Sequence, residues 1–328
     1  MKVSVLGCGR WGSFIAWYLC NQGHEVYSWG PEDDYSYKVL KETGKNEYVT
    51  LDARIRLTCD LQEAVEHAET VIISISSQGL RGFVKRILAY DVAAKNFVLC
   101  RKGSEVDTGS RLSEVLVQSG ISADQVAVWV GPGHIQAFTQ GIPNCMVIDS
   151  ANETLKRALA DNFKSDLIRF YYGSDLIGTE IGAAAKNVMG IVAGVLDGCG
   201  YVSLKGSLMS RGAREVARLI KAMGGNELSA YGLAHLGDYE ATLFSEYSHN
   251  RKYGEMLVRG EKFAKLAEGV PTAAAMKKLG EKYGVDLPIT NAVYEICYGA
   301  DDGLSCRERC EKMLAKMFAR DTKSEFYS

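Results

Sequence analysis

The sequence has little excess charge of either sign and lacks any long hydrophobic run. Lys and Arg total 38 against 40 Asp and Glu, a net charge of -2, which excludes the basic footprint that nucleic acid or an anionic membrane needs. A small-molecule partner is therefore expected. No eighteen consecutive residues are apolar, and the start, MKVSVLGCGRWG, lacks a signal-peptide layout. We expect a cytoplasmic protein without an integral membrane segment.

The nine cysteines form an odd, scattered set without a Cys-x-x-Cys pair. This usage is typical of reduced thiols in the cytoplasm. Cys306 and Cys310 are four residues apart, which would place both on one face of a helix. A structural zinc would need two more ligands nearby. We therefore interpret them as two incidental thiols and expect no metal.

The N-terminal half alternates short β-rich runs with longer helical stretches, such as 9–22 and 62–68. At 328 residues and 47% apolar, the chain is long enough for two domains. The pattern predicts a Rossmann-type doubly wound parallel sheet over residues 1–178. The strand candidates are 2–7, 25–29, 70–76, 96–102, 125–131, 145–150 and, less clearly patterned, 167–173.

After residue 178 the strand signals stop and the period becomes helical. Turn residues punctuate this part at 198–200, 224–225 and Pro288. The sequence therefore predicts an all-α domain over 179–328. No Pro-rich or Ser-rich linker separates the halves, so we expect close packing and a substrate cleft between them.

Gly7, Gly9 and Gly12 form a G-x-G-x-x-G motif that follows the strand KVSVL and opens an apolar helix. The first glycine permits a tight turn, the second lets a pyrophosphate approach the backbone, and the third lets helix pack against strand. The phosphates would meet free N–H groups at the positive helix end. A glycine-rich turn without a ligand is the alternative, but the context favours a dinucleotide site.

An acidic turn follows the second predicted strand. Glu32, Asp33 and Asp34 lie where a carboxylate would accept hydrogen bonds from the adenosine ribose. A 2′-phosphate would instead need a basic residue, and none occurs before Lys38. We predict NAD rather than NADP, with Glu32 as the ribose ligand, although a solvated turn would look the same.

Two lysines occur in unusual surroundings. Lys186 is the only basic residue of a nearly all-apolar helix predicted at 177–198. Burial would lower its pKa and make it a usable general acid or base. It could instead reach the surface or pair with Glu180 or Asp197. Lys102 ends a strand at the sheet edge where such folds bind ligands, although a strand-end lysine is often simply solvated.

Several separated segments resemble the NAD(P)-dependent glycerol-3-phosphate dehydrogenase family over nearly the whole chain. They are, in order, GCGRWG, RKGSE, GPGHIQAFTQGIP, EIGAAAKNVMGIVAGVLDG, LGD (236–238), SHNR (248–251), EGVPTA (268–273) and LPITNAVY (287–294). The resemblance implies interconversion of dihydroxyacetone phosphate and sn-glycerol 3-phosphate, a role in phospholipid biosynthesis, and Lys186 as the acid-base residue.

The resemblance also implies site residues. Lys102 and Asp238 would join Lys186 in catalysis, with Asp238 orienting the lysine or a substrate hydroxyl. The expected cofactor ligands are Gly7, Gly9, Arg10, Trp11, Gly12, Glu32, Lys102, Ile135 and Glu268. The expected substrate ligands are Lys102, Gly131, Gly133, Lys186, Asp238, Ser248, His249 and Asn250.

The sequence departs from the family pattern most clearly at His249, where an arginine would grip the substrate phosphate. Imidazole is largely neutral at pH 7 and offers one donor, whereas guanidinium is permanently charged and forks onto two oxygens. Arg251 could compensate, or the substrate's anionic group could differ. The loop after residue 131 also departs from the pattern, and its His134 is a second candidate site histidine.

Three hypotheses therefore remain from the sequence. The first is a glycerol-3-phosphate dehydrogenase. The second is a relative acting on another small phosphorylated or carboxylated ketone. The third is a nucleotide-binding sensor without turnover, against which the presence of both lysines speaks. A homodimer is also expected, because an all-α domain leaves apolar surface to cover.

Overall fold

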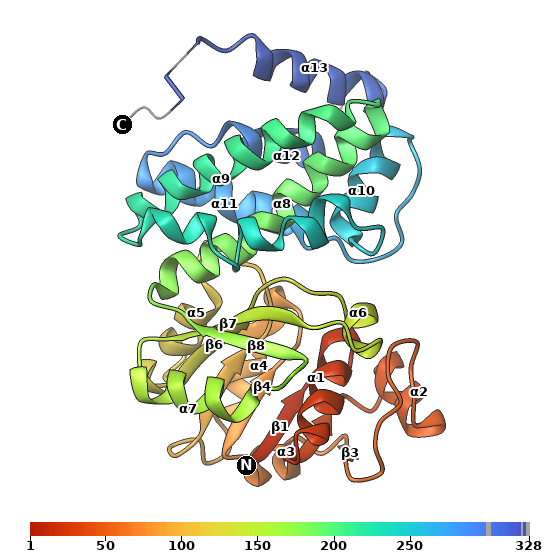
Figure 1. The fold of residues 1–328 in the computed structure, drawn as a ribbon, viewed down its shortest axis with the longest axis vertical. Coiled ribbons are helices and arrows are strands. Elements are labelled where there is room, and N and C mark those ends of the chain that lie inside the picture. The colour runs from red at the N-terminus through yellow and green to blue at the C-terminus, as the bar shows by residue number, and fades with distance from the viewer. Residues whose placement is uncertain (300–302, 323, 326–328) are drawn as a thin grey trace.

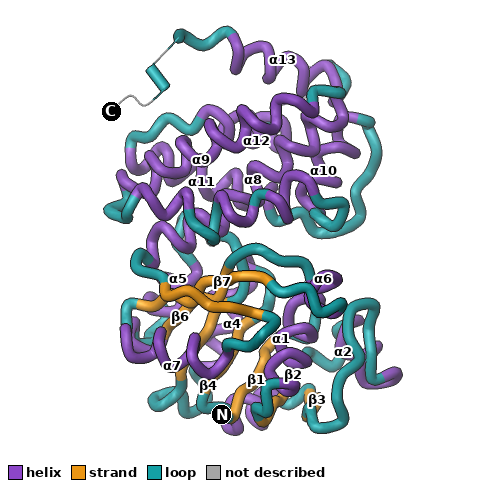
Figure 2. Tube along the Cα trace, viewed as in Figure 1, coloured by secondary structure: helices purple, strands orange, loops and turns teal. Residues whose placement is uncertain are grey.

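The computed structural model describes residues 1–299, 303–322, 324 and 325. Its chain forms a sheet-containing part and, stacked on it, a helical part (Figure 1). Figure 2 shows that the strands are confined to the first part. The strands are β1 (Lys2–Leu6), β2 (Glu25–Trp29), β3 (Arg56–Thr58), β4 (Thr70–Ile73), β5 (Asn96–Leu99), β6 (Val126–Val130), β7 (Asn144–Ser150) and β8 (Ile168–Tyr172).

The eight strands form one sheet in the order β3-β2-β1-β4-β5-β6-β7-β8. The predicted Rossmann-type sheet and its seven strand candidates are confirmed, with one added strand and one pair that is not parallel. The three-residue edge strand β3 was too short to give a periodic signal. The pair β6–β7 is antiparallel, because the connection 131–143 carries only a five-residue helix and returns along the same sheet edge.

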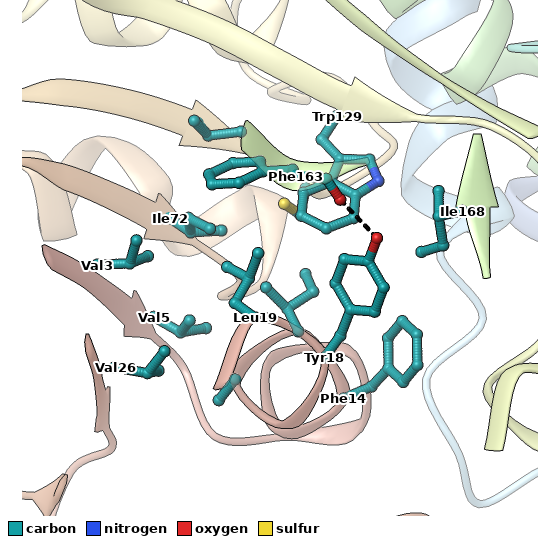
Figure 3. Close-up of a cluster of buried hydrophobic side chains, with 14 of the residues drawn as sticks. Val3, Val5, Phe14, Tyr18, Leu19, Val26, Ile72, Trp129, Phe163 and Ile168 are labelled. Carbon is teal, nitrogen blue, oxygen red and sulfur yellow. Dashed lines mark hydrogen bonds between the residues drawn. The ribbon is translucent and has the colours of Figure 1, made fainter. Parts of the chain in front are cut away.

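Helices cover both faces of the sheet. On one face pack α1 (Arg10–Asn21), α6 (Ile135–Thr139) and α7 (Glu153–Phe163); on the other pack α3 (Leu61–His67), α4 (Leu80–Ile87) and α5 (Leu112–Gln118). Figure 3 shows the first face, where Phe14 and Leu19 of α1 lie beside strand residues and the Tyr18 hydroxyl donates to the Phe163 carbonyl at 2.5 Å. These contacts fix the N-terminus of α1, and therefore the glycine motif, against the sheet.

The second part is built from helices, as predicted. They are α8 (Leu176–Cys199), α9 (Lys205–Ala222), α10 (His249–Val258), α11 (Gly269–Tyr283), α12 (Pro288–Tyr298) and α13 (Cys306–Phe318), and α2 (Tyr35–Thr43) belongs to the first part. The division at 178/179 stays a prediction, since α8 runs through it from Leu176. The range 179–328 also includes residues 300–302, 323 and 326–328, which lie outside the described residues.

Helix α8 is the central element of the helical part. By length and composition it is the one helix among the described residues that could cross a membrane, yet 78% of its most apolar window is buried inside the protein. That is the behaviour of a core helix. Its buried Glu180 also accepts hydrogen bonds from the backbone N–H of Ser113 at 2.9 Å and from Arg111 at 2.6 Å. These bonds tie the start of α8 to α5 of the sheet part.

Close packing of α10 on α8 depends on glycine. A Cβ at Gly194 would lie 1.8 Å from the Arg251 carbonyl oxygen, and one at Gly254 would lie 2.1 Å from that of Ile191. Neither position has room for a side chain, so the two backbones come into direct contact. This contact holds the first turn of α10 beside the middle of α8, where Lys186 lies.

Candidate active site

A pocket of about 290 Å³ lies where the carboxyl edge of the sheet meets α8 and α10. The cleft expected between the two domains is present there. It is lined by Arg10, Trp11, Cys100, Arg101, Lys102, Gly133, His134, Lys186, Asn187, Asp238, Ala241, Tyr247, Ser248, His249, Asn250, Leu266 and Glu268. Segments from seven separate stretches of chain therefore meet in one small, polar space.

The glycine motif has the geometry that a dinucleotide requires. Gly7 has φ +112°, and a Cβ at Gly12 would lie 1.6 Å from the Gly7 carbonyl oxygen, so both glycines are required by the protein's own packing. Gly9 differs, because nothing lies within 4 Å of the position of its missing Cβ. That open space beside the N-terminus of α1 fits a pyrophosphate approaching the backbone. The residues present therefore fit a bound dinucleotide.

A second pocket, of about 460 Å³, continues from the glycine motif along the end of β2. Gly7 and Gly9 line it together with Pro31, Asp34, Ser36 and Arg86. Asp34 also begins α2, where its carboxylate accepts a hydrogen bond from the Tyr37 backbone N–H at 3.0 Å. Glu32, the expected ribose ligand, is exposed and does not line this pocket. The carboxylate in position is Asp34, two residues further along.

Lys102, Lys186 and Asp238 meet at the centre of the main pocket. The Asp238 carboxylate, only 1% exposed, lies 2.5 Å from the Lys102 Nζ and 3.2 Å from the Lys186 Nζ. Lys102 also donates to the Gly131 carbonyl at 2.7 Å. Lys186 donates to the Thr242 hydroxyl at 2.8 Å. Two ammonium groups on a single carboxylate leave net positive charge in the cluster.

Lys186 has the perturbed acidity that its position in α8 suggested. Burial lowers its pKa to about 8; Asp238 opposes this shift and the Lys102 charge adds to it. The side chain is 12% exposed, so it does not extend to solvent. The other partners considered from the sequence are engaged elsewhere: Glu180 binds Arg111 and Asp197 binds Lys205. An amine with a pKa near 8 can both give and take a proton at physiological pH.

The first turn of α10 forms the wall facing this cluster. Ser248 begins the helix and its hydroxyl accepts a hydrogen bond from the Arg251 backbone N–H at 3.3 Å. Asn250 donates to the Asn187 side-chain oxygen at 3.0 Å and accepts from the Gly269 N–H at 2.8 Å. The predicted substrate residues Ser248, His249 and Asn250 thus line the pocket together.

Both histidines of the pocket are held neutral at pH 7. Burial, assisted by the positive charges of Arg10 and Lys186, lowers the pKa of His134 to about 4, and its Nε2 is buried without a partner among the described residues. Burial, together with Arg10 and Lys265, also lowers the pKa of His249. Each imidazole therefore offers hydrogen bonds rather than charge, as expected of His249 from the sequence.

The structure brings most of the expected site residues to the two pockets and leaves a few away. Ile135 is fully buried in the core beneath the sheet, and Glu32 points to solvent. Sequence reasoning missed Arg101, which pairs with Glu268, and also Asn187 and Thr242. Thr242 is four residues after Asp238, so helical spacing was a weak signal for it; no local signal marked Arg101 or Asn187.

Comparison with known proteins agrees with this geometry. Residues 2–156 match the family model for the N-terminus of NAD-dependent glycerol-3-phosphate dehydrogenase, and 175–305 match that for its C-terminus. The chain is similar to glycerol-3-phosphate dehydrogenase [NAD(P)+] of Pelodictyon phaeoclathratiforme, at 32% identity over 99% of both chains. It is also similar to that of Moorella thermoacetica, at 34% identity over 90% of this chain and 91% of the relative.

Solved structures show the same fold. The glycerol-3-phosphate dehydrogenase of Coxiella burnetii superposes with a TM-score of 0.85 at 24% identity, covering 95% of this chain and 98% of that one. The match extends over the sheet part and the helical part together. The chain belongs to the NAD-dependent glycerol-3-phosphate dehydrogenase family.

Proposed function

We propose that this protein interconverts dihydroxyacetone phosphate and sn-glycerol 3-phosphate with a nicotinamide dinucleotide. The observation that carries the proposal is the cluster of Lys102, Lys186 and Asp238 beside the opening over Gly9. It places an acid-base group and net positive charge next to a fitting dinucleotide site. The relatives reported above are named glycerol-3-phosphate dehydrogenase [NAD(P)+], which supports glycerol 3-phosphate as one member of the substrate pair.

The side chains of the cluster account for the proton and charge demands of ketone reduction. A bound NAD(P)H would supply the hydride. Lys186 donates a proton to the carbonyl oxygen as negative charge develops there, and Lys102 adds positive charge beside it. Asp238 orients both ammonium groups. In the oxidation direction Lys186, deprotonated, accepts the hydroxyl proton.

For the cofactor we infer a preference for NAD over NADP. Asp34, and not Glu32, supports this preference, because Asp34 lines the pocket at the end of β2. A carboxylate there accepts from a ribose hydroxyl and repels a 2′-phosphate. Arg86 lines the same pocket, with its guanidinium 5.7 Å from the Trp29 ring centre. Comparing kcat/KM for NADH and NADPH, with Asp34→Asn as the variant, decides whether repulsion by Asp34 or attraction by Arg86 dominates.

A substrate panel tests the reaction itself. NADH absorbance is followed with dihydroxyacetone phosphate and other small phosphorylated or carboxylated ketones, with Lys186→Ala as the inactive control. Turnover of dihydroxyacetone phosphate that depends on Lys186 supports the proposal. Turnover of a different ketone alone would contradict it in favour of another substrate, and tight NADH binding without any turnover would indicate a sensor.

We further propose a cytoplasmic homodimer that supplies glycerol 3-phosphate for phospholipid biosynthesis. The nine free thiols support a reducing compartment. Exposed apolar side chains of the helical part, among them Val202, Leu228 and Phe318, support self-association. Light scattering coupled to size exclusion measures the mass, and a monomer at micromolar concentration would contradict the dimer.

A further inference from the structure

The main pocket is lined by four lysine or arginine side chains, and three of them form ion pairs with a carboxylate. Lys102 and Lys186 share Asp238, and Arg101 pairs with Glu268. Arg10 forms no ion pair with any carboxylate of the described residues. Its contacts are a hydrogen bond to the Gln136 side-chain oxygen at 3.4 Å and the Tyr48 ring, 5.3 Å from the guanidinium.

Arg10 is therefore a partly buried permanent charge without a direct ion pair, although the negative charge of Glu47 acts on it from the adjoining pocket. Its Nε has no hydrogen-bond partner within the described part of the chain. Holding a guanidinium in that state costs free energy that an arriving anion would recover. A surface arginine would not carry this cost, because water would solvate it.

The position of Arg10 selects which anion it meets. It begins α1, directly after Gly9, yet it is absent from the residues that line the adenosine-side pocket. Instead it lines the main pocket and an adjoining outer pocket of about 450 Å³. The charged residues that line this outer pocket besides Arg10 are Lys252, Lys262, Lys265, Glu47 and Glu246, so lysines outnumber glutamates there. The guanidinium thus lies on the substrate side of α1, where the two pockets adjoin; we call this border, lined by Arg10 and His249, the mouth.

The two other candidates for an anion ligand nearby are poorer. His249 lines both pockets beside Arg10, but burial and the charge of Arg10 lower its pKa, which keeps it neutral. Arg251 is paired with Asp197 at 3.3 Å and with Glu255 at 3.1 Å, and it does not line the pocket. The compensation by Arg251 considered from the sequence is therefore not available in this arrangement.

We propose that Arg10 is the residue that grips the phosphate group of the substrate, with His249 beside it as a neutral hydrogen-bond donor. The inference rests on the proposed function and adds to it the residue that recognises the anionic end. A guanidinium can fork onto two phosphate oxygens, and the nearby lysines would draw the dianion into the mouth. The pyrophosphate of the dinucleotide is the other phosphate within this chemistry, and the experiment separates the two.

The test compares wild type, Arg10→Gln and Arg10→Lys on dihydroxyacetone phosphate and on unphosphorylated dihydroxyacetone. Loss of a charge-assisted contact should raise KM for the phosphorylated ketone about 10- to 100-fold in Arg10→Gln. The kcat/KM for dihydroxyacetone should stay within about twofold, since that substrate lacks the group that Arg10 binds. Arg10→Lys should fall between, because lysine keeps the charge and loses the fork.

Two further variants make the test specific. Arg54→Gln removes one positive charge from the surface at a residue that lines neither pocket, and should leave kcat, KM and the Kd of NADH unchanged. Adding His249→Arg to Arg10→Gln restores a guanidinium at the same mouth and should recover most of the lost affinity for the phosphorylated ketone. Recovery would show that Arg10→Gln weakens substrate binding because a fixed positive charge is lost, and not because the variant folds poorly.

Binding measurements distinguish failure of this inference from failure of the proposed function. The Kd of NADH is followed by fluorescence, and sn-glycerol 3-phosphate is titrated calorimetrically, which needs no turnover. Arg10-dependent binding of glycerol 3-phosphate in an enzyme without turnover would overturn the function and keep the phosphate grip. Two results would contradict phosphate binding by Arg10. One is an unchanged KM for dihydroxyacetone phosphate and an unchanged Kd for glycerol 3-phosphate in Arg10→Gln. The other is weaker NADH binding with an unchanged KM for the ketone.

Discussion

The dinucleotide side and the substrate side of the site are built in different ways. The pyrophosphate site of the dinucleotide side comes from one continuous β1–α1 segment, where Gly7, Gly9 and Gly12 lie within six residues. The substrate side is assembled from the ends of β5 and β6, the middle of α8 and the first turn of α10, which are far apart in sequence. A local segment dictates its own geometry, whereas an assembled wall depends on how two domains pack.

This contrast predicts that chemistry and nucleotide binding can be separated by mutation. The largest effect is expected from Lys186→Met, which removes the proton donor and keeps an unbranched side chain of similar length. The kcat for ketone reduction should fall by roughly 10²- to 10⁴-fold, while the Kd of NADH stays within about threefold. Steady-state rates and NADH fluorescence measure the two, and a parallel loss of both would contradict the separation.

The reverse separation is expected from Gly9→Val. Nothing lies within 4 Å of the missing Cβ, so the fold should tolerate a side chain there while the pyrophosphate meets it. We expect NADH affinity to fall by about 10- to 100-fold with an unchanged melting temperature. Gly12→Ala serves as the contrast, because its Cβ would strike the Gly7 carbonyl and the protein itself should be destabilised.

How far the sequence predicts each side follows from the same contrast. The Rossmann-type sheet, the helical second part, the glycine motif and the two lysines were predictable, because each leaves a periodic or local signal. The sequence places Glu32, Asp33 and Asp34 in one turn, and a run of acidic residues does not indicate which of them faces the pocket that Asp34 lines. Ile135, expected as a cofactor ligand from the resemblance, has its side chain in the core, so its role at the site stays a prediction. Arg101 and Asn187 could not be found from the sequence, because their partners Glu268 and Asn250 lie far away along the chain.

The pH dependence probes the substrate side alone. The pKa of Lys186 is lowered to about 8, chiefly by burial. Ketone reduction needs the protonated amine, so kcat/KM should fall about tenfold per unit as the pH rises above about 8; alcohol oxidation needs the free amine and should rise through the same range.

Asp238→Asn sharpens this prediction. The Asp238 carboxylate raises the pKa of Lys186 and so opposes the effect of burial. Without this carboxylate, the midpoint pH of the rate profile for ketone reduction, and that for alcohol oxidation, should be lower than in the wild type. Rates measured between pH 6 and 10 in both directions give the midpoints, and a midpoint that stays in place would mean that another group titrates.

The smallest expected effect is that of His249→Arg in the wild-type background. The first turn of α10 is held by direct backbone contact with α8, so a new arginine there would start from a fixed position beside Arg10. A second guanidinium should lower KM for the phosphorylated ketone by less than about tenfold, because the two cations also repel each other before the anion arrives. The gain should shrink as salt is raised. An unchanged KM at low salt would mean that His249 lies outside the reach of the phosphate, and would leave the anion to Arg10 alone.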